Sequence, residues 1–238
     1  MTLLEQVLDA NGGLKRWREL QRVSVRMSID GALFARKGKS GALANVVVEG
    51  HTGEQFLRFT GFPSPSKRGV YRPDRVAVEA LDGAELEARD GPRAAFAGHT
   101  EATPWDDLHL LYFAGYTNWN YLTTPFLFTY PGVETEELGP WEQDGETWSR
   151  LKVEFPPDIV THSPEQVFYF DEEGLQRRMD YRALDAGGAS IALYSWEHKD
   201  FSGIVVPTLR RALRMEPDGS AASGPAFLNV EIFDASFE

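Results

Sequence analysis

The sequence predicts a mainly antiparallel β fold of the α+β type, in which an N-terminal helix and a central helical insertion cross one curved sheet. Three observations support this fold class. Apolar and polar residues alternate over most of the 238 residues, turn pairs such as Asp-Gly and Glu-Gly separate the alternating runs, and helical spacing is confined to two segments. No flexible linker divides the chain, so we expect a single domain over residues 1–238.

The first helical segment extends from Leu3 to Leu20. Its apolar residues form two runs at helical spacing, Leu3, Leu4, Val7 and Leu8, followed by Leu14, Trp17 and Leu20. Asn11-Gly12-Gly13 separates the two runs. We expect Gly13 to end one helix and a second helix to begin after it, because glycine adopts the left-handed conformation at which helices often terminate.

The pattern changes to a period of two from Arg22 onward. Val23, Val25, Met27 and Ile29 alternate with polar residues, which is typical of a half-buried strand. Similar runs occur at Leu43–Glu49, Gln55–Thr60, Arg75–Ala80, Glu85–Arg89, Trp148–Phe155, Val167–Phe170, Leu175–Leu184, Ser190–Lys199, Val205–Met215 and Phe227–Phe233. Short strands at this regular spacing predict an antiparallel meander.

The central insertion begins near Thr103. Thr103 is suited to cap a helix, Pro104 to its first turn, and Asp106 and Asp107 to the positive end of the helix dipole. We expect this helix to end at about Ala114. A second short helical piece is expected over Asn118–Thr123.

The stretch Trp105–Pro131, the aromatic segment below, holds nine of the 29 aromatic residues of the chain in 27 positions. Tyr and Trp need hydrogen-bond partners when buried, and rings mixed with short polar groups are typical of pocket walls. We therefore expect a wall or lid over a hydrophobic ligand. The alternative is a helix packed on the sheet through its rings. The ligand-binding candidates are Trp105, His109, Tyr112, Tyr116, Trp119, Tyr121 and Phe126.

Composition excludes several classes of function. The formal net charge of −12 disfavours binding to nucleic acid phosphates or anionic lipid surfaces. The absence of cysteine excludes disulfides, thiol catalysis and zinc–thiolate sites, and the spacing of the five histidines does not suit a metal, so we expect neither metal nor cofactor. We see no signal peptide and no apolar run long enough to span a membrane, so we expect a cytoplasmic protein.

Two histidines are candidates for acid–base chemistry. His162 precedes the apolar strand that contains Tyr169, in the turn-like sequence Thr161-His162-Ser163-Pro164, so we expect it at a cavity mouth, with Tyr169 as a possible tyrosine partner. The alternative is a loop histidine that bonds nearby backbone. His198 shares one strand face with Tyr194 and Trp196, while Ile191, Leu193 and Ser195 share the other, and either face can line the concave side.

The strand Leu175–Leu184 presents the same choice of faces. Tyr181 lies on one face with Met179, and Arg178 and Asp180 lie on the other. We interpret the second face as solvated, with ion pairs of little energetic value. Tyr181 and Trp196 then complete the set of ligand-binding candidates.

The opening of the chain resembles that of LolA-like lipoprotein-carrier domains. The similarity lies in a short amphipathic helix, Ala10-Asn11-Gly12-Gly13, an aromatic-containing turn of helix, and a strand that begins Arg22-Val23-Ser24-Val25. This resemblance implies a strongly curved half-barrel sheet whose open side is closed by helices, with an apolar cavity for acyl chains or other hydrophobic ligands. The chain departs from the family in having no lipidation cysteine and in an aromatic segment unusually rich in Tyr, Trp and Asn.

These observations favour a cytoplasmic protein that binds a hydrophobic or aromatic small molecule. A cofactor-independent enzyme is the alternative, using His162 or His198 with a tyrosine on a polyketide-like or other ring-containing substrate. A purely structural or partner-binding β domain is a third interpretation, and it requires the interior to be filled.

Overall fold

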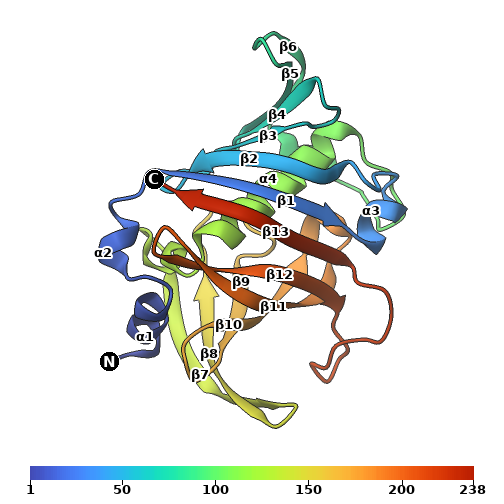
Figure 1. The fold of residues 1–238 in the computed structure, drawn as a ribbon. Coiled ribbons are helices and arrows are strands. Elements are labelled where there is room, and N and C mark those ends of the chain that lie inside the picture. The colour runs from blue at the N-terminus through green and yellow to red at the C-terminus, as the bar shows by residue number, and fades with distance from the viewer.

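The computed structural model describes residues 1–238 and contains one sheet of thirteen strands in the order β6-β5-β4-β3-β2-β1-β13-β12-β11-β10-β9-β8-β7 (Figure 1). All neighbouring strands are antiparallel, as the sequence predicts. The strands are β1 (Arg22–Asp30), β2 (Leu43–His51), β3 (Leu57–Thr60), β4 (Lys67–Tyr71), β5 (Arg75–Ala80), β6 (Glu85–Asp90), β7 (Glu134–Gln143), β8 (Glu146–Glu154), β9 (Glu165–Phe170), β10 (Gln176–Ala183), β11 (Ala189–Phe201), β12 (Ile204–Arg214) and β13 (Leu228–Phe237). The curved sheet encloses α4, which confirms the predicted half-barrel architecture.

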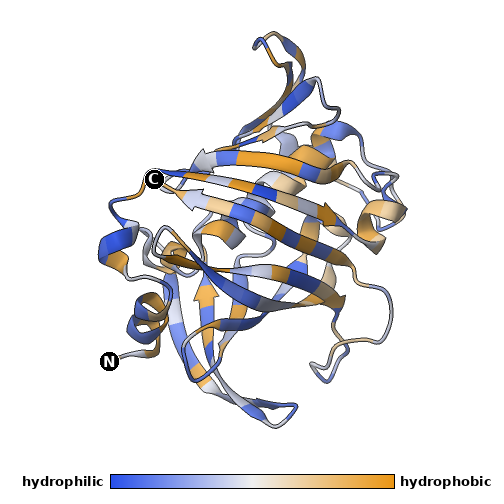
Figure 2. Cartoon of the chain, viewed as in Figure 1, coloured by the Kyte–Doolittle hydropathy of each residue, from blue (hydrophilic) through white to orange (hydrophobic).

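Paired strands are neighbours in the chain except at the centre of the sheet, where β1 pairs with β13, and β6 and β7 are the two edge strands. Val25 lies opposite Val48 of β2 and Ala235 of β13. The apolar residues of β1 are buried and their polar neighbours are more exposed, because successive side chains point to opposite faces. Figure 2 shows this alternation along the strands.

Four α-helices accompany the sheet: α1 (Leu3–Ala10), α2 (Leu14–Trp17), α3 (Ala32–Arg36) and α4 (Asp107–Thr123). Short 3-10 helices are η1 (Pro92–Phe96), η2 (Phe126–Thr129) and η3 (Leu184–Ala186). A capping box of Thr2 and Glu5 begins α1. The expected role of Gly13 is wrong in detail, since Asn11 caps the end of α1 and Gly13, with φ 83°, begins α2.

The central helix α4 is one continuous helix of 17 residues, where the sequence predicts two shorter pieces. Its N-cap is Asp106, not Thr103, and the ring of His109 completes a capping box with Asp106. Fifteen of its residues are buried, from Leu108 to Thr123 with the exception of His109. A helix that is buried on all sides lies in the core of a domain, so α4 fills the concave side of the sheet.

Gly115 allows α4 to approach the sheet closely. A Cβ atom built on Gly115 would lie 2.1 Å from Cγ of Tyr71 in β4. The ring of Tyr71 therefore lies directly against the backbone of the helix. A residue with a side chain would force the helix and β4 apart.

Two strands are not predicted by the alternation of residues. β4 contains Gly69, against which Leu111 of α4 packs, so the strand lacks one of its apolar side chains. β7 is an edge strand with mostly exposed charged residues and the pair Gly139-Pro140. Such residues protect the edge of a sheet from pairing with other chains, and they remove the apolar pattern that predicts strands.

Candidate functional site

Buried polar side chains gather around His162 between α4 and the sheet. His162 has no exposed surface and lies in the loop between β8 and β9. Its Nδ1 lies 3.4 Å from the hydroxyl of Tyr116, and its Nε2 lies 3.3 Å from the hydroxyl of Tyr121. The Tyr121 hydroxyl is also 3.2 Å from that of Tyr181, on β10. These four side chains are the tyrosine–histidine cluster.

Burial controls the ionisation of this cluster. It lowers the pKa of His162 to about 3, and the positive charge of Arg93 acts in the same direction. Burial also raises the pKa of Tyr121 well above its usual value. All members of the cluster are therefore neutral at pH 7. The expected position of His162 at a cavity mouth is wrong, because α4 and the sheet enclose its ring.

Arg93 and Asp185 lie at one side of this cluster. A nitrogen of the Arg93 guanidinium is 3.3 Å from a carboxylate oxygen of Asp185, and another bond of 2.8 Å runs from Arg93 to the carbonyl oxygen of Thr161. Arg93 also lies over the ring of Tyr116. A surface hollow lies beside this ion pair. It is lined by Arg93, Thr161 and the proline-rich loop at Pro156 and Pro157.

The other candidates of the aromatic segment lie along the same core. The Trp119 indole donates a hydrogen bond of 2.9 Å to the carbonyl oxygen of His51, and Phe126 stacks on Trp17 with ring centroids 4.4 Å apart. Trp105 contacts Phe113, while Tyr112 contacts Tyr71. His109 lies at the start of α4, where its Nδ1 is 2.7 Å from Asp106 and its ring packs edge-on against Phe96. The rings thus pack a helix onto the sheet.

Tyr169 and Trp196 lie on the opposite face of the sheet from the tyrosine–histidine cluster. Tyr169 belongs to a second, small apolar cluster with Trp148, Ala192 and Tyr194, against which Trp196 packs. The Tyr194 and Trp196 rings are stacked, and Trp141 of β7 packs edge-on against Tyr169 in the same cluster. The structure therefore does not bring the catalytic candidates His162 and Tyr169 together.

Arg178 is the centre of this second cluster and is fully buried, so the expectation of a solvated face is wrong there. It donates bonds of 2.6 and 2.9 Å to the two carboxylate oxygens of Asp180, and one of 2.6 Å to the carbonyl oxygen of Gly219. Its guanidinium lies over the rings of Trp141, Tyr169 and Tyr194. Arg178 is covered by the β7–β8 hairpin and by the segment after β12. The alternation of residues along β10 does not indicate this burial.

His198 is partly buried and separate from His162. Burial lowers its pKa to about 4, and the charge of Arg210 contributes in the same direction. Nε2 of His198 has no hydrogen-bond partner. Sequence reasoning missed Arg210, which is buried beside the end of α4. Arg210 shares the period-two register of the buried residues Val206, Thr208 and Ala212, and that register is the signal that could have found it.

Several buried polar atoms along α4 have no partner. They are the Tyr112 hydroxyl, Oγ1 of Thr117, and the side-chain carbonyl oxygens of Asn118 and Asn120, together with the hydroxyl of Tyr71, which faces the helix. Buried polar groups are almost always hydrogen-bonded in folded proteins. Their concentration on one helix marks the boundary between α4 and the sheet as the place where a polar ligand atom or water is needed.

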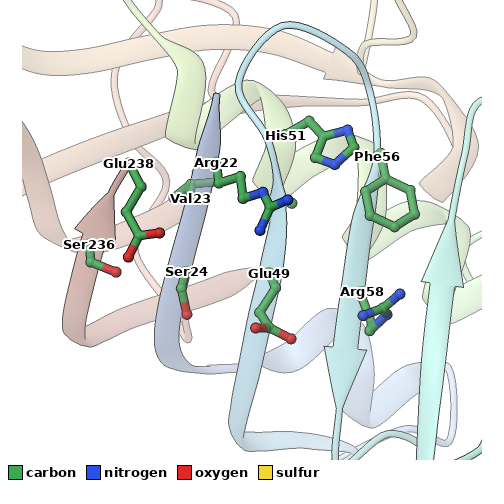
Figure 3. Close-up of a pocket in the computed structure, with 10 residues that line it drawn as sticks. Arg22, Val23, Ser24, Glu49, His51, Phe56, Arg58, Ser236 and Glu238 are labelled. Atoms are coloured by element: carbon green, nitrogen blue, oxygen red, sulfur yellow. The ribbon is translucent and has the colours of Figure 1, made fainter. Parts of the chain in front are cut away.

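A large surface hollow lies on the convex face of the sheet (Figure 3). Its side chains come from β1, β2, β3 and β13 and carry both signs of charge, as with Arg22, Glu49 and Arg58. None of the predicted site residues lines it. No three His, Asp or Glu side chains gather as metal ligands, and no helix is long and apolar enough to cross a membrane.

Comparisons with solved structures show a LolA-like fold. A putative outer membrane lipoprotein-sorting protein domain from Vibrio parahaemolyticus aligns with 99% of this chain and 91% of its own, at 9% identity and a TM-score of 0.54. A DUF1329 family protein from Desulfovibrio piger aligns over 100% and 94%, at 14% identity and a TM-score of 0.50. A LolA superfamily protein from Nitrosomonas europaea aligns with 94% of this chain and 91% of its own, at 9% identity and a TM-score of 0.48. No family model and no curated protein matches the sequence.

Proposed function

We propose that the protein binds a hydrophobic small molecule between α4 and the concave face of the sheet. The observation that carries this proposal is the set of unpartnered polar atoms along α4, set among buried rings. An apolar ligand with a few polar atoms would satisfy them while it covers the aromatic side chains. Ligand sites of this kind are mainly apolar, with a small number of placed polar groups.

The energetic argument separates a binding site from an ordinary core. A buried hydroxyl without a partner costs about 1–3 kcal/mol of stability. A segment whose only role is packing gains stability when such a tyrosine is replaced by phenylalanine. Tyr71 and Tyr112 are both fully buried, and both hydroxyls are unpartnered. Their retention is explained if a ligand accepts or donates hydrogen bonds there.

The fold and the surface are compatible with this proposal. The likeness to the Vibrio parahaemolyticus lipoprotein-sorting domain extends over nearly the whole chain. The hollow at Pro156, Pro157 and Thr161 lies beside the Arg93–Asp185 pair, one residue from His162. We take this hollow as the entrance, with the ion pair at its inner end. Residues of α4 would then be the walls of the bound state.

The test compares a fully buried tyrosine whose hydroxyl has no partner with a partly buried tyrosine whose hydroxyl is hydrogen-bonded. Tyr112→Phe removes a hydroxyl that has no hydrogen-bond partner. Tyr130→Phe removes a hydroxyl that donates a hydrogen bond of 2.6 Å to the carbonyl oxygen of Thr52. We expect Tyr112→Phe to keep or raise the melting temperature and to weaken binding of a neutral fluorescent probe such as N-phenyl-1-naphthylamine. Tyr130→Phe should lower the melting temperature without a specific loss of affinity. Absence of probe binding by the wild-type protein would refute the proposal.

The acid–base enzyme remains a second candidate because one imidazole lies within reach of two tyrosine hydroxyls. A neutral His162 is able to accept a proton from a substrate hydroxyl or carbon acid. Its low pKa makes it a weak base, so the proposal of binding is stronger. When a turnover assay exists, full activity of both His162→Gln and His198→Gln would remove histidine from any mechanism.

A further inference from the structure

Two arginines are almost completely buried, and their electrostatic surroundings differ. Arg178 is 0% exposed and forms a two-bond ion pair with Asp180. Arg210 is 2% exposed, and no carboxylate lies within ion-pair distance of its guanidinium. Buried charges in proteins are normally paired with an opposite charge, because removal from water is costly. Arg178 follows this rule, and Arg210 lacks such a pair.

The hydrogen bonds of Arg210 are to main-chain carbonyl oxygens. One guanidinium nitrogen donates a hydrogen bond of 2.8 Å to the carbonyl oxygen of Pro207. Another donates a hydrogen bond of 3.1 Å to that of Tyr121, in the last turn of α4. The guanidinium also lies over the Tyr121 ring, with 5.3 Å to the centroid. Arginine has five N–H groups, so these two bonds leave donors unused. Burial lowers the pKa of Arg210 to about 10, so it remains charged at pH 7.

Ser195 of β11 lies directly opposite Arg210 in the strand pair. Directly opposed residues of antiparallel strands have side chains on the same face, so the Ser195 hydroxyl and Arg210 both point to the concave side. Ser195 is 0% exposed, and its hydroxyl has no hydrogen-bond partner. Nε2 of His198, which is close enough for the charge of Arg210 to lower the pKa of its ring, is also buried and unpartnered.

We propose that Arg210 and Ser195 bind the carboxylate of an amphiphilic ligand whose apolar part lies along α4. The arginine supplies the positive charge and the fork of N–H donors that a carboxylate matches, and the serine donates a further hydrogen bond. The charge of one buried arginine is balanced by a group of one negative charge, whereas a doubly charged phosphate would leave a buried negative charge unpaired. This inference rests on the proposed function, and it adds the chemical class of the ligand.

The competing explanation is that Arg210 only stabilises the end of α4. The Tyr121 carbonyl is one of the last four of the helix, which have no partner within the helix, and a cation there interacts favourably with the helix dipole. The helix end carries only about half a negative charge. This explanation gives no partner to the Ser195 hydroxyl. It also predicts a loss of stability, not of ligand selectivity, when Arg210 is replaced.

The experiment measures how well oleate, methyl oleate and oleyl alcohol displace N-phenyl-1-naphthylamine from the wild-type protein at pH 7. The three have the same apolar chain, and only oleate is an anion. The variants are Arg210→Met and Ser195→Ala, with Arg211→Met as the control, because Arg211 is the next residue of β12 and is exposed. Thermal melts of each variant are recorded in parallel.

We expect the wild-type protein to prefer oleate over methyl oleate by about tenfold or more, as charge-assisted hydrogen bonds provide. Arg210→Met should abolish that preference, Ser195→Ala should reduce it without lowering the melting temperature, and Arg211→Met should retain it. Equal affinity of the wild type for oleate and methyl oleate would overturn the inference while leaving the proposed function intact. The inference would also be overturned if a folded Arg210→Met variant kept the full preference for oleate. If Arg210→Met does not fold, an unchanged preference in Ser195→Ala would overturn it. Displacement by none of the three would overturn the inference, whereas absence of probe binding by the wild-type protein would refute the proposed function as well.

Discussion

The imidazole of His162 lies flat against the ring of Tyr181, with centroids 4.0 Å apart and planes 12° apart. The only nearby charge that acts on its pKa is that of Arg93, which is positive. A protonated His162 would therefore be a buried cation beside another cation. Protonation of this ring is therefore unfavourable in the folded protein, and we expect acid to destabilise the cluster.

His162 should cause a loss of stability as pH falls from 6.5 towards 3. Its pKa is about 3 in the folded protein and near 6.5 in the unfolded chain, so the unfolded chain binds more protons throughout that window. Each pH unit then costs up to about 1.4 kcal/mol per histidine. Urea unfolding of wild type and His162→Gln at pH 7, 6 and 5 measures the difference. We expect a shallower pH dependence in the variant, and identical slopes would contradict the prediction.

Gly115→Ala should destabilise the protein strongly. The new methyl group would lie 2.1 Å from Cγ of Tyr71, a rigid ring held in the core. Overpacking of this kind typically costs about 1–3 kcal/mol, and a short contact with a ring places it at the upper end. Gly53→Ala is the matched control, since nothing lies within 4 Å of a Cβ at that exposed position. Similar denaturation midpoints for the two variants would show that α4 can shift away from β4.

Arg178→Gln should cost about 3–5 kcal/mol, because it leaves the Asp180 carboxylate without its charged partner in a mostly buried cluster. It also removes the donor to the Gly219 carbonyl. We expect faster hydrogen exchange and faster proteolysis in the segment after β12. Adding Asp180→Asn should recover part of the lost stability. Strict additivity of the two substitutions would mean that the pair is not coupled.

Trp119→Ala should lower the free energy of unfolding by about 3–5 kcal/mol, because the indole is almost wholly buried. Trp119→Phe keeps a ring and loses the bond to the His51 carbonyl, so its cost should be smaller, about 1 kcal/mol. Thermal melts and probe titrations on the same samples distinguish core from lid. An unchanged melting temperature with lost probe affinity would identify Trp119 as a lid residue.

The sheet could be predicted because its signal is local. Strands such as β1 and β12 have one buried and one more exposed face, and the alternation of residues records this directly. β4 and β7 escaped prediction because Gly69 replaces a side chain in one and exposed charges cover the other. The extent of α4 was underestimated because Tyr, Thr and Asn are weak helix formers, and burial by the sheet outweighs that preference.

The candidate site was predicted only in part because strand faces are set by the partners of the sheet. Tyr181 and Trp196 are both aromatic residues on neighbouring strands, yet only Tyr181 faces α4. Trp196 lies on the face covered by the β7–β8 hairpin, which no local pattern indicates. Arg210 was missed for the same reason. Its surroundings are formed by Ser195 on the paired strand and by Tyr121 in α4, and both are distant from Arg210 in the sequence.

The pairing of β1 with β13 has a consequence for how the protein forms during synthesis. All other neighbours in the sheet are successive hairpins, which can form as soon as each leaves the ribosome. β1 must wait for β13, and until then two separate meanders present unpaired edges to solvent. We expect closure of this central seam to be the slow, long-range step of folding, and chaperones that protect strand edges would act before it.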